Sequence, residues 1–167
     1  MPLYPKRSSM PERVERCAPS PARPRPFFAR DDASSVDNGP TGTRVLVVED
    51  DYLVAMEIEA ALVDAGFDII GVVATAEEAV TLAGSERPAL VVMDIRLAGK
   101  RDGVDAALEL FSKHAIRCVF ATAHSDNDTR LRAEPASPLG WLQKPFSMTS
   151  LVDTIRNALN EMDKSER

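Results

Sequence analysis

A short stretch from Val91 to Leu97 constrains the fold more than any other part of the sequence, because an apolar run there leads directly to a single carboxylate, Asp94. Runs of this kind are typical of strands that are buried on both faces of a parallel sheet. The residue after such a strand lies at the carboxyl edge of the sheet, where open α/β folds place their chemistry. Asp94 is therefore the first candidate for a reactive residue.

The rest of the folded region repeats this pattern. Further apolar runs have the length and composition of strands, at residues 45–48, 69–73, 116–121 and 139–143. Helical patterns fill the intervals, near residues 52–65, 76–83, 104–113, 125–134 and 147–160. Strands that alternate with helices through short loops predict an α/β fold: a doubly wound, five-stranded parallel sheet with helices on both faces.

The first predicted helix has its apolar positions Leu53, Met56, Ala60 and Val63 at helical spacing, which predicts its apolar face. Gly66 follows as the residue that supplies the left-handed turn at a helix end.

The other helices carry their own boundary signals. Thr75 and Glu78 form a capping-box pattern at the start of the second helix, and Gly84 and Pro88 predict its end. Ser147 is the predicted N-cap of the last helix. The region 125–134 has Leu131 as its only large apolar residue, so we expect a short helix there that packing holds weakly.

Proline content and charge distinguish an N-terminal segment from the rest of the chain. The protein has 20 Lys and Arg against 26 Asp and Glu, a net charge of −6. Because residues 1–42 are rich in proline and arginine and poor in apolar side chains, they are predicted to be a disordered extension. Either it has no function, or it is a partner-binding arm that carries Arg23-Pro24-Arg25-Pro26. Residues 43–162 form the predicted domain, and 163–167 a C-terminal tail.

The composition also excludes several classes of protein. An acidic domain is a poor nucleic-acid binder, because phosphate contacts need clustered Lys and Arg. No stretch approaches the roughly 18 apolar residues of a membrane span, and the N-terminus has no apolar secretory segment. We therefore expect a cytoplasmic protein without nucleic-acid or membrane partners. The two cysteines, Cys17 and Cys118, make neither a disulfide framework nor a metal site, and Cys118 is predicted to be buried.

Polar residues stand at the predicted ends of four strands: Glu49 and Asp50, Asp94, Thr122, and Lys144. With strand order 2-1-3-4-5, the first and third strands are neighbours, so the three carboxylates converge. They repel one another unless a cation lies among them, and oxygen ligands suit Mg²⁺. Lys144 and the Thr122 hydroxyl can then bind phosphoryl oxygens. The set fits a carboxylate that accepts a phosphoryl group and becomes an aspartyl phosphate.

Other phosphate and hydrolase motifs are missing. The turn after the first strand is Glu-Asp-Asp, which would repel a pyrophosphate, and not a glycine-rich loop. The sequence contains no Walker A loop, no G-x-S-x-G motif and no Cys/His metal spacing. His114 and His124 are far apart and offer no catalytic triad.

These short motifs together resemble the receiver domain of response regulators. The resemblance covers about Arg44 to Met162 and rests on residues 47–51, on Met93-Asp94 with Asp102-Gly103, on 121–123 and on 144–146. It implies the flavodoxin-like receiver fold. It also implies that Asp94 is the phosphoacceptor, with a sensor histidine kinase or a histidine phosphotransferase as the donor.

The resemblance also implies roles for other residues. Asp50 would ligate Mg²⁺ directly and Glu49 through water, and the backbone carbonyl of Arg96 would be a further ligand. Thr122 and Lys144 would bind the phosphoryl group. Trp141 stands at the position of the switch aromatic, which works together with Thr122.

The sequence departs from the commonest receiver pattern in places. The loop between Asp94 and Asp102 is one residue longer and has no proline, and Trp141 replaces the usual Tyr or Phe. Residues 120–122 are similar to the start of the Phe-Ala-Thr-Gly signature of a single-domain subfamily from alphaproteobacterial stress signalling. However, Ala123 stands at the glycine of that signature and Ser125 at its tyrosine.

Three functions remain open at this point. The first is a stand-alone response regulator that signals by a phosphorylation-dependent contact with a protein partner through residues 125–160, because the chain stops five residues after Met162. The second is a phosphate sink that drains a kinase. The third is a small Mg²⁺-dependent phosphatase, which usually has an aspartate where this chain has Arg96. We otherwise expect no enzyme activity beyond self-directed phosphoryl transfer, with Arg96 and His124 as candidates to control water attack.

Overall fold

The computed structural model describes residues 42–123 and 126–165. The strands are β1 Arg44–Val48, β2 Asp68–Val73, β3 Leu90–Met93, β4 Cys118–Thr122 and β5 Gly140–Gln143. The helices are α1 Tyr52–Asp64, α2 Ala76–Glu86, α3 Gly103–His114, α4 Asn127–Ala133 and α5 Met148–Ser165, with a short 3₁₀ turn, η1, at Glu134–Ala136. Residues 1–41 of the predicted extension, as well as His124 and Ser125, lie outside the described residues.

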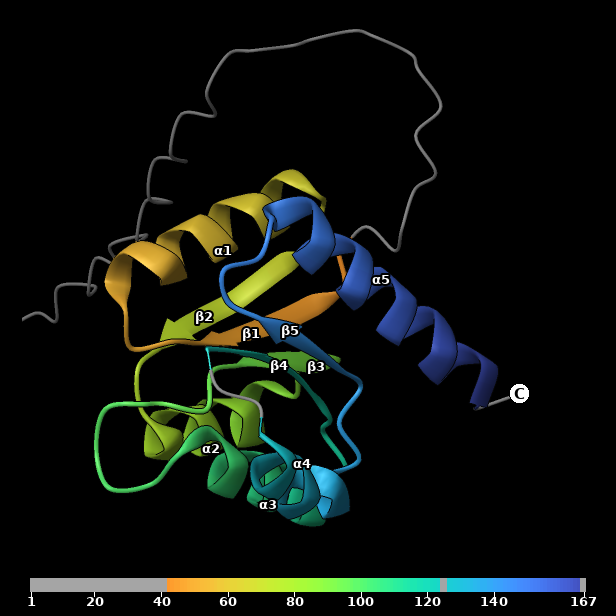
Figure 1. The fold of residues 1–167 in the computed structure, drawn as a ribbon. Helices are drawn as coiled ribbons and strands as arrows, with labels where there is room; N and C mark the ends of the chain where they lie inside the picture. The colour runs from red at the N-terminus through yellow and green to blue at the C-terminus, as the bar shows by residue number, and fades with distance from the viewer. Residues whose placement is uncertain (1–41, 124–125, 166–167) are drawn as a thin grey trace, which may run out of the picture. The chain divides into compact units, whose positions relative to one another are not determined.

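The five strands form one parallel sheet with the order β2-β1-β3-β4-β5, as predicted. Figure 1 shows α1 and α5 on one face of this sheet and α2, α3 and α4 on the other. In β1, Val45 and Val47 pack with α1 and α5, whereas Leu46 and Val48 pack with α2 and α3. This alternation follows from the two-residue period of a strand and buries both faces of the sheet.

The predicted C-terminal end of α1 and the predicted N-caps of α2 and α5 are confirmed. Gly66 has a φ of 93° and closes α1, with the Phe67 amide donating to the Leu62 carbonyl at 3.0 Å. The Glu78 amide donates to the Thr75 hydroxyl at 3.2 Å. The Ser150 amide donates to the Ser147 hydroxyl at 3.1 Å, which is the cap expected at the start of α5.

The predicted apolar face of α1 is wrong. The stripe of Leu53, Met56, Ala60 and Val63 faces solvent, and a different set, Ala55, Ile58 and Leu62, is buried. Both sets have helical spacing, because α1 is apolar on most of its circumference. The pattern alone therefore does not say which side meets the sheet.

Two helices are longer than predicted. α2 continues through Gly84 and ends at Glu86. The next residue, Arg87, adopts the left-handed conformation with a φ of 50°. α5 continues to Ser165, so residues 163–165 of the predicted tail are helical. Glycine inside a helix costs only about 1 kcal/mol, which the rest of α2 offsets.

α4 is short, as predicted. It spans seven residues, of which Ala133 is buried, while Leu131 is 65% exposed. The Thr129 amide donates to the Asp126 side chain at 2.8 Å and caps its start. Because α4 buries little apolar surface, polar contacts to neighbouring elements contribute more to its position than in the other helices.

Candidate functional site: an acidic pocket at the carboxyl edge of the sheet

The predicted site residues meet at the carboxyl ends of the strands. Glu49 and Asp50 follow β1, and Asp94 follows β3, which pairs with β1 so that Val48 lies opposite Met93. Thr122 is the last residue of β4, and Lys144 follows β5. The Lys144 amide donates to the Thr122 carbonyl at 2.9 Å, so the ends of β4 and β5 are held together. The Lys144–Pro145 peptide bond is cis.

Lys144 joins two of the carboxylates. Its ammonium lies 2.7 Å from an Asp94 oxygen and 2.6 Å from a Glu49 oxygen. The side chains of Glu49 and Asp94 are 2% and 8% exposed, and that of Lys144 is 19% exposed. Charge-assisted hydrogen bonds in such a partly buried position are stronger than those on the surface. The ammonium therefore fixes both carboxylates and faces the candidate phosphoacceptor.

Hydrogen bonds hold both the backbone and the carboxylate of Asp94 in place. Its backbone amide donates to the Val48 carbonyl at 2.9 Å, which fixes the main chain. One carboxylate oxygen accepts from the Arg96 amide at 3.3 Å, and the other accepts from Lys144. The Arg96 side chain is exposed. The carboxylate is consequently oriented in the pocket before any ligand arrives.

Gly103 has a packing role that its place in the sequence motif does not reveal. A Cβ at this position would overlap the Asp94 carbonyl oxygen, and it would lie 2.9 Å from both the Asp94 carbonyl carbon and Met93 Cγ. The Gly103 amide also donates to the Ile95 carbonyl at 2.8 Å. The start of α3 therefore packs directly on the backbone of Asp94, which only glycine allows.

The pocket perturbs two of its ionisable groups. Burial raises the pKa of Glu49 above its usual value, and the nearby charge of Asp94 acts in the same direction, although the hydrogen bond from Lys144 opposes it. Burial alone would lower the pKa of Lys144, but the hydrogen bonds to Asp94 and Glu49 outweigh it, and the pKa is raised. Lys144 is therefore charged at neutral pH. Outside the pocket, burial raises the pKa of the Cys118 thiol to about 12, in agreement with a buried, inert cysteine.

The donor set fits a hard divalent cation. Glu49, Asp50 and Asp94 each offer an oxygen, and these oxygens lie within 4.8 Å of one another. Glu49 and Asp94 are buried, whereas Asp50 is exposed, which leaves an open side. Oxygen ligands with room for water suit Mg²⁺. One ammonium among three carboxylates leaves net negative charge in the pocket, which a divalent cation would neutralise.

The predicted switch residues lie on neighbouring strands. Thr122 is buried at the end of β4, and Trp141 in β5 stacks on Phe120 of β4 with ring centroids 4.6 Å apart. The Arg130 guanidinium of α4 lies 4.8 Å from the centre of the Trp141 ring. No local pattern predicts this contact, because it joins residues of two separate elements.

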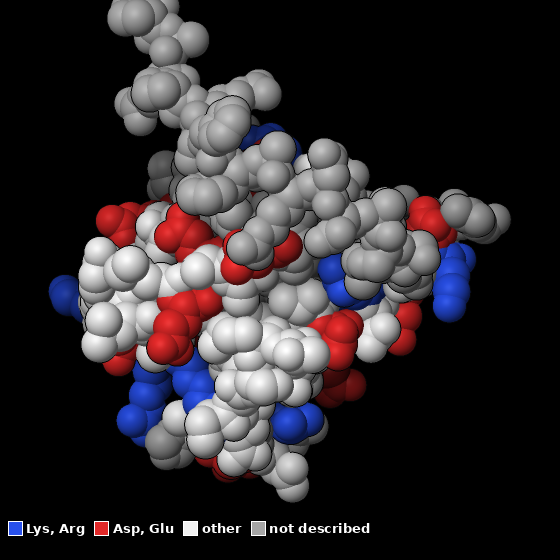
Figure 2. All heavy atoms as spheres, turned by 90° about the horizontal axis from the view of Figure 1, so that it is seen from above, with Lys and Arg blue, Asp and Glu red and all other residues white. Residues whose placement is uncertain are grey.

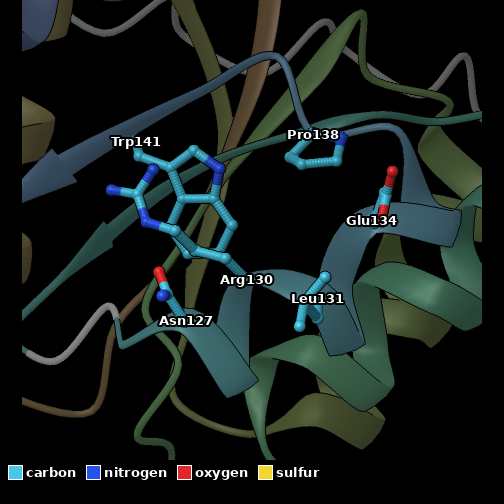
Figure 3. A pocket seen from close by; sticks show the side chains of 6 residues that line it. All are labelled: Asn127, Arg130, Leu131, Glu134, Pro138 and Trp141. Carbon is cyan, nitrogen blue, oxygen red and sulfur yellow. The ribbon is translucent and has the colours of Figure 1, made fainter.

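A pocket of about 390 Å³ lies between α4 and β5, on the side of the predicted partner surface. Figure 3 shows the side chains that line it: Asn127, Arg130, Leu131, Glu134, Pro138 and Trp141. Its walls combine an aromatic face and a leucine with a guanidinium and a carboxylate. Aromatic residues and arginine are enriched in protein–protein interfaces relative to the rest of the surface.

Comparisons with known proteins agree with this geometry. Residues 45–156 match the response regulator receiver domain family. The chain is 39% identical over 117 residues to the transcriptional regulatory protein PdtaR of Mycobacterium tuberculosis, which covers 70% of this chain and 57% of PdtaR. It is 36% identical over 118 residues to the phyllosphere-induced regulator PhyR of Methylorubrum extorquens, covering 70% of this chain and 43% of PhyR.

A solved structure is similar as well. The signal receiver domain of a modulated diguanylate cyclase from Desulfovibrio desulfuricans G20 is 35% identical with a TM-score of 0.68, covering 74% of this chain and 98% of that domain. By contrast, the chain spans only about half the length of the curated relatives PdtaR and PhyR.

Within the residues that the structure describes, no helix is both long enough and apolar enough to span a bilayer. The five-stranded order, the acidic pocket with its lysine and the family match over residues 45–156 agree with one another. The chain belongs to the response regulator receiver domain family.

Proposed function

We propose that this protein is a two-component response regulator that accepts a phosphoryl group on Asp94 from a histidine kinase or a histidine phosphotransferase. The observation that carries the proposal is the contact of Lys144 with the Asp94 carboxylate, 2.7 Å away, beside two further carboxylates. This arrangement provides a fixed nucleophile, a cation for a phosphoryl oxygen and ligands for a divalent metal.

In the proposed reaction, an Asp94 oxygen attacks the phosphorus of a phosphohistidine. A P–O bond forms, the P–N bond breaks, and the imidazole leaves. Glu49, Asp50 and Asp94 would hold Mg²⁺, with the Arg96 carbonyl as a further ligand; the bound ion would neutralise charge on the incoming group. Lys144 and the Thr122 hydroxyl bind phosphoryl oxygens. Water later hydrolyses the acyl phosphate, so the chemistry stays on this protein and no separate substrate is turned over.

The proposal is tested by incubating the full chain with acetyl phosphate and Mg²⁺. We expect the intact mass to rise by one phosphoryl group, with the modification on Asp94. Asp94→Asn should show no increase, because an amide is a poor nucleophile. Asp105→Asn, which changes an aspartate on α3, is the matched control and should be modified like the parent chain. An unchanged mass of the parent chain would remove the proposal.

A second expectation concerns Mg²⁺ alone. At about 100 times its dissociation constant, Mg²⁺ should raise the free energy of unfolding by about 2.7 kcal/mol, because it binds only the folded pocket. The gain should largely disappear in Asp50→Asn and persist in Asp64→Asn, which alters an exposed carboxylate at the end of α1. Thermal unfolding with and without Mg²⁺ measures this gain in the parent chain and in each variant. An equal gain in the two variants would argue against a metal site in the pocket.

A protein donor needs a surface beside the pocket, and α1 offers one. Of the exposed large apolar side chains that the structure describes, most belong to α1 and the adjoining edge strand β2: Tyr52, Leu53, Met56, Val63 and Val72. A hollow of about 330 Å³ between these elements is lined by both Asp50 and Met56. Figure 2 looks onto this side of the molecule and shows Asp and Glu beside uncharged surface. We propose that a donor with apolar and basic side chains contacts this region.

Met56→Asp should therefore slow phosphoryl transfer from a cognate histidine kinase about tenfold or more, because it places a charge in an apolar contact. The rate with acetyl phosphate, which makes no such contact, should stay unchanged. Leu131→Asp, a matched change at an exposed leucine of α4, should leave both rates unaltered. Equal rates of kinase transfer for Met56→Asp and the parent chain would exclude this surface.

We further propose that phosphorylation changes the pocket between α4 and β5 through Thr122 and Trp141, and that a downstream protein binds there, within residues 125–160. The buried position of Thr122 and the contacts of Trp141 with Phe120 and Arg130 support this proposal. An affinity capture with phosphorylated and unphosphorylated chain would identify such a partner.

A further inference from the structure

α4 is tied to the phosphoacceptor loop by an ion pair that the receiver motif does not include. The Arg132 guanidinium of α4 contacts the Asp102 carboxylate, at the end of the loop that leaves Asp94. The two side chains are 49% and 33% exposed. An exposed ion pair stabilises little by itself. α4, however, buries only Ala133 fully, so a contribution of this size is a large part of what holds it.

Asp102 has two functions at once. One of its oxygens accepts the Asp105 amide at 2.9 Å and caps α3, and the other contacts Arg132. The next residue, Gly103, packs on the Asp94 carbonyl and donates to the Ile95 carbonyl. Asp102 is therefore one residue from a rigid contact with the phosphoacceptor backbone. We therefore expect a movement of the loop at Asp94 to displace the carboxylate that Arg132 contacts.

A hollow beside Asp102 leaves the loop and α4 apart on one side. A hollow of about 540 Å³ lies between the loop and the first turn of α4, lined among others by Arg96, Asp102, Asp126 and Thr129. Loop and helix are thus separated by open space on one side, and the Arg132–Asp102 pair bridges them. On its other side, α4 presents Arg130 to Trp141. The same short helix therefore connects the loop at Asp94 with the pocket of Figure 3.

We propose that the Arg132–Asp102 ion pair is a latch that holds α4 against the phosphoacceptor loop and transmits a change at Asp94 to the pocket between α4 and β5. This connection acts in addition to the one proposed through Thr122 and Trp141. Holding α4 is a property of the unphosphorylated protein, and only the transmission rests on the proposed function. Arg132 is a positioning residue, because it acts through α4 and touches no reacting atom.

Amide hydrogen exchange of the unphosphorylated full chain tests the latch. Arg132→Gln should speed exchange of residues 127–133 about threefold to fivefold, as expected for the loss of up to 1 kcal/mol from a local opening equilibrium. Asp102→Asn should have the same effect, because asparagine keeps the cap of α3 but removes the charge. The double variant should show no further increase, and Arg132→Lys should restore part of the protection.

Controls separate the latch from a general loss of stability. Arg101→Gln breaks an ion pair with Glu109 within the neighbouring α3 region and should leave exchange in α4 unchanged. In 1 M salt, where the screening length falls to about 3 Å, the parent chain should approach the variants. Unchanged exchange of α4 in both Arg132→Gln and Asp102→Asn would overturn the latch.

The transmission is tested with Trp141, the single tryptophan of the chain. Phosphorylation of the parent chain should change its emission, and in Arg132→Gln at least half of that change should be lost at equal phosphorylation by mass. A full change in Arg132→Gln would overturn transmission through the latch. If Asp94 is not phosphorylated in the parent chain, the proposed function fails, while the exchange experiment still decides whether the latch exists.

Discussion

Gly103→Ala should lower the free energy of unfolding by about 3 kcal/mol or more, at the upper end of the cost of overpacking. The added methyl group would overlap the Asp94 carbonyl oxygen, and the next nearest atoms, at 2.9 Å, include a second backbone atom. Backbone at the end of a central strand does not move aside as a flexible side chain does. The start of α3 must therefore shift, and urea unfolding of the two chains measures the cost.

The loop that precedes Gly103 offers a matched control. Gly99 has a φ of 106°, but a Cβ there would meet only Glu77, at 3.8 Å. Gly99→Ala should therefore cost only the left-handed conformation of a residue with a side chain, about 1 to 2 kcal/mol. Phosphorylation by acetyl phosphate should be slowed in Gly103→Ala and not in Gly99→Ala. Equal losses of stability would show that α3 does not pack on Asp94 as described.

Lys144→Met should lower the free energy of unfolding by about 3 kcal/mol in metal-free buffer, because it leaves two buried carboxylates without their cation. Glu49 and Asp94 both contact the ammonium and are nearly inaccessible to water. Methionine has a similar length and removes the charge with little change in packing. Saturating Mg²⁺ should recover part of the loss, since it supplies positive charge to the same carboxylates.

Lys113→Met is the control for this substitution. Lys113 pairs with Glu109 on the surface of α3, with 62% of its side chain exposed, so its loss should cost about 0.3 to 0.5 kcal/mol. Phosphorylation of Asp94 should fall about 100-fold or more in Lys144→Met, as when one preorganised charge is removed from a phosphoryl-transfer site, and stay unchanged in Lys113→Met. Similar stability losses in the two variants would mean that Lys144 is not a buried partner of the carboxylates.

Local sequence patterns are enough to predict the architecture of the domain and the composition of the pocket. Strands buried on both faces read as continuous apolar runs, so their number, order along the chain and parallel pairing follow from local pattern. The polar residue after each run, such as Asp94 after β3, then falls at the common edge. Helix caps such as Thr75 and Ser147 were predictable for the same reason, because a cap depends on residues within one turn.

Long-range packing, by contrast, establishes which side of α1 faces the sheet. It also establishes the contacts of Arg132 with Asp102 and of Arg130 with Trp141. α1 has two apolar stripes, and the choice of Ile58 and Leu62 over Leu53 and Met56 depends on how the helix docks on β1 and α5. Arg132 and Arg130 of α4 contact Asp102 and Trp141, which lie on separate segments of the chain. Contacts between distant segments depend on the docking of whole elements, which the short-range periodicity of a sequence does not encode.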